Sequence, residues 1–438
     1  MIYVPRIIEE SILNHIRSDS PPFNVILLSG ARQCGKSTLL KHLFPSENHI
    51  HINLGLEGGL CDAIDATENF DDFTLLLENR LDYKMGSKKI LILDEAQLSK
   101  KLGSYVRFMK EKWQTQHVIL TGSTLSTLFD NKEKPTGRVV EFVLRPFNFV
   151  EFLKALEKGP LLKRIENFSP QQPFSQTLHQ EIIRLLQIYL TVGGLPEVVL
   201  TYRDGKDYLS LLANIFAFYK RDFQEKLSSE NLTAIFSQTF LRIAAATGSP
   251  IKLTSIIKSS SPGYKKVADV LSLLESWHQI IRVDPETSKL STVGTITPKR
   301  YIFDHGIRFL QNPARFQDLN LLDTAHLKRE EIGGLLENFV LSELSSLHSP
   351  LPIRSWSKTH QSGFIDFLFQ DGKNNFAIEV KSAQKLDQKH LAYLLAYQEF
   401  YPKSVLILAN LSPGGIYKKG KTDFWNIPIY ALYTFLKR

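Results

Sequence analysis

The first residues whose types and spacing could do chemistry lie near the amino end, where a lysine and a serine follow a glycine-rich turn. Residues 30–37 read Gly-Ala-Arg-Gln-Cys-Gly-Lys-Ser, with an apolar run before them and a helix-like run after them. This is the spacing of a phosphate-binding loop between a strand and a helix. The alternative is an ordinary glycine-rich turn, which would not need a strand before it and a helix after it. The residues expected to bind a nucleoside triphosphate are Gly30, Ala31, Arg32, Gln33, Cys34, Gly35, Lys36, Ser37 and Thr38.

Each residue type in this loop has a chemical task. Gly30 and Gly35 let the backbone take positive φ and approach a polyphosphate closely, so that amide N–H groups point at the anion. Lys36 is expected to neutralise the outer phosphates, and Ser37 to offer its hydroxyl to Mg²⁺. Thr38 begins the helix and could donate to the α-phosphate. The loop therefore predicts binding of ATP together with Mg²⁺.

Two carboxylates follow a second apolar run. Asp94 and Glu95 come directly after Ile90–Leu93, a pattern typical of a central parallel strand that delivers acids to its carboxyl end. Asp94 is expected to hold the Mg²⁺ shell, and Glu95 to polarise the attacking water. Alternatively, the strand ends in acids only because the chain returns to solvent. One strand later, Thr121 or Ser123 is expected near the γ-phosphate, with a helix N-cap as the other interpretation of Ser123.

Another set of charged residues lies near the carboxyl end. Asp366 stands in one strand-like run, and Glu379 and Lys381 stand in the next, where a period of two places both on one face. Asp366 and Glu379 could hold Mg²⁺, Glu337 could add a carboxylate from a helix, and Lys381 could activate water. A Glu-x-Lys pair in a strand is also common surface patterning. These residues indicate a candidate metal site and leave cleavage activity open.

A sheet is needed to position the amino-terminal residues. Apolar runs predict its strands at residues 25–28, 49–54, 90–93, 117–121 and 139–144. Strands of this kind that alternate with helix-like segments favour an α/β fold with a parallel sheet.

The middle of the chain has a different pattern. Residues 151–230 are helix-patterned, and residues 231–311 follow the order helix, helix, turn at 260–263, helix and two strands, which is a winged-helix order. Lys265 and Lys266 begin the third helix, where a recognition helix meets nucleic acid. The alternative is a module that packs against protein.

Several motifs occur together in the order of a known family. The motifs GARQCGKST, ILILDEAQ, LTGS, Gly137-Arg138 before a strand, RPFNFVEF and GGLPE resemble the prokaryotic AAA-type ATPases that carry a DUF4143 C-terminal region. The resemblance spans nearly the whole chain and implies an AAA+ core of the helicase-loader and STAND-like neighbourhood, a helical lid, and a homo-oligomer. It makes Arg138 the candidate for an arginine that contacts nucleotide, in its own or in a neighbouring subunit.

The carboxyl-terminal acids carry a second resemblance. Asp366 and Glu379-Val380-Lys381 are similar to the PD-(D/E)xK restriction-endonuclease-like core, although Ile365 stands where that core has proline. The expected fold class is thus α/β, with four domains: a P-loop AAA+ parallel-sheet core at 1–150, a helical lid at 151–230, a winged-helix-like domain at 231–322 and a nuclease-like α/β domain at 323–438.

Composition narrows the class of protein. The chain has 438 residues, 43% of them hydrophobic and 22% charged, and no apolar run approaches the roughly 18 residues of a membrane span. Its start lacks the pattern of a signal peptide, which predicts a cytoplasmic protein without a membrane partner. Cys34 and Cys61 give no disulfide framework. The net charge of +8 permits DNA as a partner.

These patterns together favour an ATPase that binds and hydrolyses MgATP and couples it to a C-terminal module that acts on DNA. The alternative is a STAND-like nucleotide switch whose nuclease-like domain binds without cleaving. A third hypothesis is an ATP-driven protein remodeller with no affinity for nucleic acid.

Overall fold

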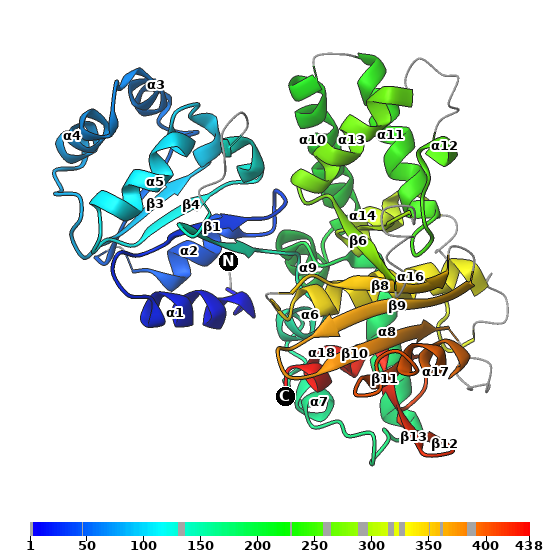
Figure 1. The fold of residues 1–438 in the computed structure, drawn as a ribbon. Helices are drawn as coiled ribbons and strands as arrows, with labels where there is room; N and C mark the ends of the chain where they lie inside the picture. Colours follow the sequence, from blue (N-terminus) through cyan, green and yellow to red (C-terminus); the bar gives the residue numbers. More distant parts are fainter. Residues whose placement is uncertain are drawn as a thin grey trace. The chain divides into compact units, whose positions relative to one another are not determined.

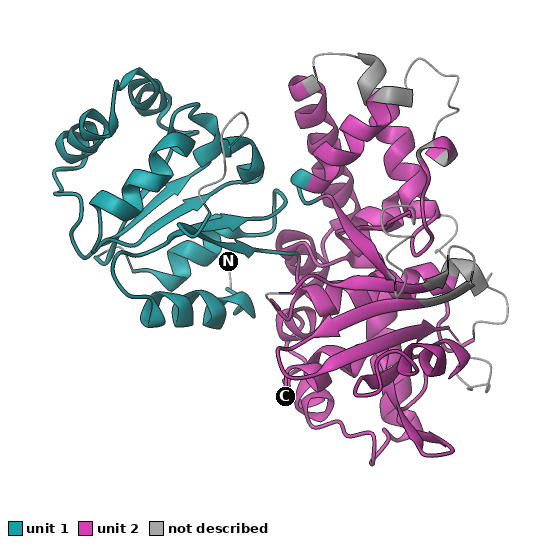
Figure 2. Cartoon of the chain, viewed as in Figure 1, with its two compact units in different colours: residues 1–145, 276–278 teal, residues 146–275, 279–438 magenta. Residues whose placement is uncertain are grey.

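The computed structural model describes residues 3–45, 47–129, 136–227, 230–256, 264–287, 297–313, 319–323, 329–349, 351–359, 362–382 and 391–438. The chain folds into two compact units (Figure 2): unit 1 has residues 1–145 and 276–278, and unit 2 has residues 146–275 and 279–438. Unit 1 ends close to the expected boundary at 150, whereas the expected boundaries at 230 and 322 fall inside unit 2. The turn expected at 260–263 lies outside the described residues.

Unit 1 is built on a parallel sheet, as the sequence predicts (Figure 1). Its described strands are ordered β2-β3-β4-β1-β5, with β1 at Val25–Ser29, β2 at His49–Asn53, β3 at Ile90–Asp94, β4 at Val118–Thr121 and β5 at Val139–Val143. The helices are α1 (Ile8–Ser18), α2 (Lys36–Leu43), α3 (Gly58–Ala66), α4 (Phe70–Leu81) and α5 (Leu102–Lys112), and two 3₁₀ turns are η1 (Ala96–Leu98) and η2 (Leu125–Phe129). All strand pairs are parallel, so every carboxyl end lies at one edge.

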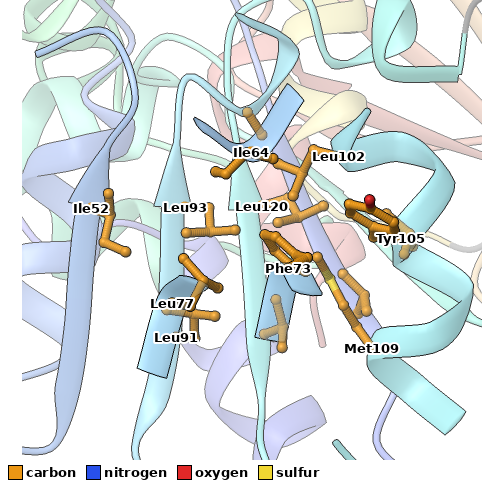
Figure 3. Close-up of a cluster of buried hydrophobic side chains, with 14 of the residues drawn as sticks. Ile52, Ile64, Phe73, Leu77, Leu91, Leu93, Leu102, Tyr105, Met109 and Leu120 are labelled. Atoms are coloured by element: carbon orange, nitrogen blue, oxygen red, sulfur yellow. The ribbon is translucent and has the colours of Figure 1, made fainter. Parts of the chain in front are cut away.

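The core of unit 1 explains why its strands are apolar runs. Alternate residues of each strand point to one face, where they pack against α3, α4 and α5 (Figure 3). Leu93 and Leu120 from the sheet meet Phe73 of α4 and Tyr105 of α5 in this cluster. Helices α1 and α2 lie on the other face (Figure 1). A strand covered on both faces has no polar side, which is why the sequence shows continuous apolar segments.

Unit 2 contains a mixed sheet. Its described strands are ordered β12-β13-β11-β10-β9-β8-β6-β7, with β6 at Ile280–Thr287, β7 at Lys299–Ile302, β8 at Arg354–Thr359, β9 at Ser362–Gln370, β10 at Asn375–Lys381, β11 at Val405–Asn410, β12 at Gly415–Lys419 and β13 at Thr422–Pro428. Trp356 and Leu408 belong to the cluster of buried residues that packs against helix α17 (Ala392–Gln398). Strand β10 pairs antiparallel with β9 and parallel with β11.

Helices make up the rest of unit 2. They are α6 (Phe149–Ala155), α7 (Gly159–Glu166), α8 (Gln176–Val192), α9 (Pro196–Arg203), α10 (Tyr208–Leu227), α11 (Glu230–Ala245), α12 (Leu253–Ile256), α13 (Tyr264–Ser276), α14 (His305–Leu310), α16 (Arg329–Ser345), α17 (Ala392–Gln398) and α18 (Leu432–Leu436), with a 3₁₀ turn η5 (Ile429–Ala431). None of the helices in the described ranges is both long and apolar enough to cross a lipid bilayer.

The hairpin expected at the end of the winged-helix segment is present, but it does not stand alone. Strands β6 and β7 pair antiparallel, with Ile280 opposite Ile302. Strand β6 then continues to Thr287 and pairs parallel with β8, which lies in the segment expected as the nuclease-like domain at 323–438. One sheet therefore joins two segments that the sequence assigns to separate domains.

The Gly-Gly-Leu-Pro motif fixes the start of unit 2. The Phe147 amide donates to Gly194 O at 2.6 Å, and the Tyr189 hydroxyl donates to Phe147 O at 2.6 Å. The Gly194 amide donates in turn to Asp304 Oδ2 at 2.7 Å. A Cβ on Gly194 would lie 2.2 Å from Phe147 O, so the close contact between these two backbones requires glycine.

Candidate functional site

The phosphate loop joins β1 to α2 and has the backbone that its glycines predict. Gly35 has a φ of 90° directly before α2, and Gly30 has a φ of 149°. A Cβ on Gly30 would lie 2.2 Å from Leu144 O, just after β5. A side chain is therefore unfavourable at Gly35 because φ is positive there. At Gly30 a side chain is unfavourable because φ is positive and because its Cβ would collide with Leu144 O.

Lys36 is buried at the start of α2. Its ammonium Nζ donates to Gly30 O at 2.8 Å and to Ala31 O at 3.1 Å, both within the loop. Burial lowers the pKa of Lys36, while Cys34, Glu95 and Asp94 act in the opposite direction. A phosphate group would offer this ammonium negatively charged acceptors in place of the two carbonyl oxygens.

Ser37 and Asp94 meet at the carboxyl edge of the sheet. Ser37 Oγ donates to Asp94 Oδ2 at 2.7 Å, and Asp94 is only 2% exposed. Burial alone would raise the pKa of Asp94, but His51, whose Nε2 lies 3.6 Å away, and the Ser37 hydroxyl outweigh it, so that the pKa lies below its ordinary value. A serine hydroxyl beside an ionised carboxylate is a donor set that suits Mg²⁺.

Glu95 and the residues after β4 complete this edge. Glu95 has a φ of 54°, which is unusual for a residue with a side chain, and its carboxylate accepts a hydrogen bond from Gln97 Nε2. Thr121 Oγ1 and Ser123 Oγ are buried, and neither has a hydrogen-bond partner among the described residues. The register places Thr121 beside both Leu28 of β1 and Asp94 of β3. Free hydroxyls at this edge fit the role that the sequence predicts for Thr121 or Ser123.

The other loop residues divide by exposure. Ala31 and Cys34 are buried, whereas Arg32, Gln33 and Thr38 are exposed. Gln33 has a φ of 64°, so the loop turns sharply at this residue.

Sequence reasoning missed a buried arginine behind the loop. Arg6 is 7% exposed and lies before α1. Its Nη1 donates to Cys34 O at 2.9 Å and its Nη2 to Arg145 O at 2.6 Å. No motif surrounds Arg6 in the sequence, because the carbonyls that it binds are distant along the chain. His51, beside Asp94, was missed for the same reason.

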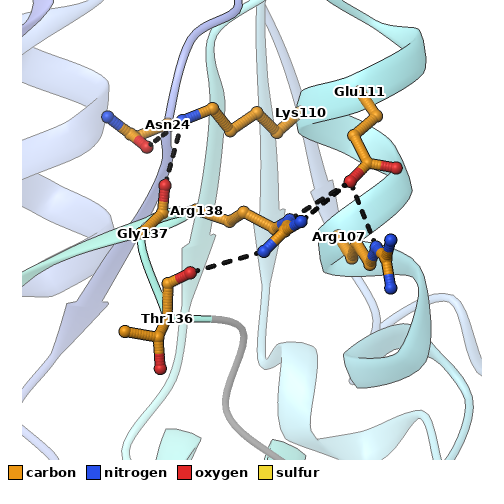
Figure 4. A network of polar contacts seen from close by, with 7 residues as sticks. All are labelled: Asn24, Arg107, Lys110, Glu111, Thr136, Gly137 and Arg138. Atoms are coloured by element: carbon orange, nitrogen blue, oxygen red, sulfur yellow. Dashed lines mark hydrogen bonds and ion pairs between the residues drawn. The ribbon is translucent and has the colours of Figure 1, made fainter.

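Arg138 lies at the opposite edge of the unit 1 sheet. Its carbonyl accepts the Val25 amide at 2.9 Å, where β1 and β5 begin. Its guanidinium donates to Glu111 Oε1 from Nε at 3.2 Å and from Nη2 at 3.1 Å (Figure 4). A strand of five residues separates it from the phosphate loop, a span of about 16 Å. This placement gives Arg138 no contact with the site of its own unit, so a role in a neighbouring subunit stays a prediction.

The charged residues of unit 2 come together as the sequence predicts. Glu337 lies on α16, Asp366 on β9, and Glu379 and Lys381 on β10. The Lys381 ammonium pairs with Glu379 Oε1. The Val380 amide donates to Asp366 Oδ2 at 2.9 Å.

A lysine that the sequence did not single out lies among these acids. Lys299 of β7 places its Nζ 2.8 Å from Asp366 Oδ1 and 3.1 Å from Glu337 Oε2. Burial by itself would lower the pKa of Lys299, but Asp366, Tyr301 and Glu337 raise it well above its ordinary value. Lys299 is therefore a fixed buried cation.

This arrangement does not support the metal prediction for Glu337, Asp366 and Glu379, which stays a prediction. The described part of the chain holds no group of three or more His, Cys, Asp or Glu residues placed to bind a metal ion. Burial, together with the Asp366 carboxylate, raises the pKa of Glu379 to about 8, while Lys381 acts in the opposite direction. The residues meet, but a lysine ammonium holds two of them.

Of the two lysines expected at a nucleic-acid surface, the structure describes the side chain of one. Lys266 lies on α13 and is exposed, and the side chain of Lys265 lies outside what the structure describes.

Three family models match this chain in series. Residues 22–153 match the AAA domain, residues 183–314 match a domain of unknown function (DUF8612), and residues 332–430 match a second one (DUF4143). An uncharacterized protein of Methanocaldococcus jannaschii is 25% identical over 222 residues, which are 49% of this chain and 45% of that protein. The match thus spans less than half the length of this relative.

Solved structures are similar at low identity. The Walker-type ATPase of Pyrococcus abyssi is 17% identical, with 69% of this chain and 94% of that chain covered and a TM-score of 0.42. The Orc1 protein of Aeropyrum pernix in complex with DNA is 14% identical, with 71% and 92% covered and a TM-score of 0.25. The family matches therefore place an AAA domain at residues 22–153, which contain the phosphate loop and the parallel sheet of unit 1, and a DUF4143 region at residues 332–430.

Proposed function

We propose that this chain binds ATP with Mg²⁺ at the carboxyl edge of the unit 1 sheet and hydrolyses it there. The observation that carries the proposal is the meeting of two chain segments. Ser37 from the phosphate loop lies 2.7 Å from Asp94 at the end of β3, and Lys36 is buried in the same loop. A phosphate anchor, a ligand pair for Mg²⁺ and an acid are the parts that phosphoryl transfer requires.

Each residue has a role in the proposed reaction. The loop amides and the Lys36 ammonium bind the phosphates, and Ser37 with Asp94 holds Mg²⁺, which neutralises phosphate charge when bound. The Glu95 carboxylate orients and polarises the attacking water. The unpartnered hydroxyls of Thr121 and Ser123 donate to the γ-phosphate or to that water. No other unpartnered hydroxyl pair in the described residues follows a strand of this sheet.

Two substitutions test the proposal. Lys36→Ala should abolish binding of ATP, as measured by calorimetry, because the buried cation for the phosphates is lost. Glu95→Gln should bind ATP as the wild type does and should not turn it over. Lys41→Ala, which changes an exposed lysine of the same helix, is the matched control and should change neither the binding nor the hydrolysis of ATP. Full hydrolysis by Glu95→Gln would refute the role of Glu95, and absence of ATP uptake by the folded wild type would refute the whole proposal.

For unit 2 we propose a contact with DNA that depends on the nucleotide state. The net charge of +8 and the exposed Lys266 on α13 support it, together with the helix and hairpin order of residues 231–311. The ATPase rate should rise with single- or double-stranded DNA and should rise less at higher salt. Changing Lys265 and Lys266 to Ala should weaken binding. Absence of any DNA binding would favour a protein remodeller instead.

A nucleotide switch whose C-terminal region does not cleave is a second candidate, and the position of Lys299 favours it. Linear DNA should stay intact in the presence of ATP and either Mg²⁺ or Mn²⁺. Cleavage by the wild type that is lost in Glu379→Ala and Lys381→Ala would restore the nuclease interpretation.

A further inference from the structure

The buried charged cluster of unit 2 contains three acids, and a lysine ammonium lies between two of them. Lys299 Nζ lies within 3.1 Å of Glu337 Oε2 and 2.8 Å of Asp366 Oδ1. An ammonium donates hydrogen bonds at such distances, whereas Mg²⁺ binds oxygen ligands at about 2.1 Å. Only 7% of the Lys299 side chain is exposed, and its backbone is fixed in β7. The ammonium therefore fills the space between these two carboxylates.

Several other polar atoms of the cluster also have partners. Asp366 Oδ2 accepts the Val380 amide at 2.9 Å. Glu337 Oε2 accepts the Tyr301 hydroxyl at 3.0 Å in addition to Lys299. Glu379 Oε1 pairs with Lys381.

One oxygen of the cluster is left over. Glu379 Oε2 is buried and has no hydrogen-bond partner in the described residues. Glu379 as a whole is 2% exposed. An unpartnered buried oxygen is costly.

We infer that Lys299 is the resident cation of this cluster: its ammonium takes the place of a divalent metal, holds β7 against α16 and β9, and closes the cluster to Mg²⁺ and Mn²⁺. The inference goes beyond ATP hydrolysis and does not depend on it, because none of these residues belongs to unit 1. It assigns Lys299, which lies outside the DUF4143 match at 332–430, to the same centre as three residues inside that match.

Removal of the ammonium should open the site. In Lys299→Ala, Asp366 Oδ1 and Glu337 Oε2 lose their shared partner. Two carboxylate oxygens that face the space left by the ammonium can bind a divalent ion together with water. The variant should therefore gain one Mn²⁺ site per chain that the wild type lacks.

The test is a Mn²⁺ titration followed by electron paramagnetic resonance, without nucleotide. All chains carry Asp94→Asn, which removes a ligand of the unit 1 site from the count. Lys299→Ala should bind one Mn²⁺ more than the parent chain, and Lys299→Ala with Asp366→Asn should lose that ion again. Lys299→Arg keeps a cation and should bind none. Mn²⁺ should raise the melting temperature of Lys299→Ala by several degrees and leave that of the parent chain unchanged.

Each outcome decides the inference. A folded Lys299→Ala that binds no Mn²⁺ would overturn it, because its ammonium would then not be standing in for a metal. A parent chain that binds Mn²⁺, and loses it on Glu379→Gln, would also overturn it. The comparison of the parent chain with Glu379→Gln tests the inference even if Lys299→Ala fails to fold. A parent chain that binds no Mn²⁺ at this cluster supports the inference that Lys299 already closes it.

Discussion

Gly122 lies between the two hydroxyls at the end of β4, and substitution of this glycine tests how Glu95 is positioned. The Gln97 side chain donates to Glu95 Oε2 and packs against the Gly122 backbone, so that a Cβ on Gly122 would lie 1.8 Å from Gln97 Oε1. The Gly122→Ala chain must therefore move the Gln97 amide by about 1.5 Å or more to restore van der Waals distance. Backbone strain does not add to this effect, since Gly122 is not among the residues with positive φ.

The size of the effect follows from the hydrogen bond that is lost. A hydrogen bond to a charged group contributes about 1.5–3 kcal/mol. If the bond between Gln97 and Glu95 holds the carboxylate toward the attacking water, its loss lowers kcat by roughly 10- to 150-fold. The KM for ATP should change little, because the phosphate contacts of Lys36 are untouched. We expect Gln97→Ala to have the same effect as Gly122→Ala.

The assay is steady-state ATP hydrolysis by the two single variants and the double variant. Because both changes remove one hydrogen bond, the double variant should be no slower than Gln97→Ala alone. Gly59→Ala is the matched control, since a Cβ there meets nothing within 4 Å. Losses that multiply in the double variant, or a Gly122→Ala chain with wild-type kcat, would show that Gln97 does not position Glu95.

Three further predictions follow from unit 2 and from Arg138. Burial raises the pKa of Glu343 to about 8, so the folded state keeps a proton that the unfolded state releases above about pH 4.3. Between these two pH values the free energy of unfolding of the wild type should fall by about 1.4 kcal/mol per pH unit relative to Glu343→Gln. Urea unfolding that gives the two chains the same dependence of this free energy on pH would contradict the prediction. Asp304→Ala leaves two buried amides, one of them from Gly194, without an acceptor and should lower the free energy of unfolding by about 2–5 kcal/mol in the same assay. Arg138→Ala should leave hydrolysis by the dilute chain unchanged and should abolish any increase of the rate with chain concentration. Glu111→Ala, the control, should keep that increase. A loss of hydrolysis by dilute Arg138→Ala would contradict the placement of Arg138.

The chemistry of unit 1 could be read from the sequence because it is local. Lys36 and Ser37 directly follow the glycine that turns the backbone, and Asp94 directly follows the strand that carries it, so chain order alone brings each to a strand end. Parallel strands then bring their carboxyl ends to one edge. Local order also placed Arg138 directly before the strand at 139–144, but only the parallel pairing of that strand with β1 puts Arg138 at the edge opposite the phosphate loop.

The centre in unit 2 shows what sequence by itself could not decide. The spacing of Asp366, Glu379 and Lys381 places them on neighbouring strands, and this much was predicted correctly. Lys299 reaches the same centre from β7, from a segment that the sequence assigned to another domain, because β6 pairs with β8 and extends the sheet. Periodicity reports which face a residue occupies, whereas the identity of its partners across a sheet depends on strand order. Only the tertiary structure sets that order, and with it which lysine contacts Glu337 and Asp366.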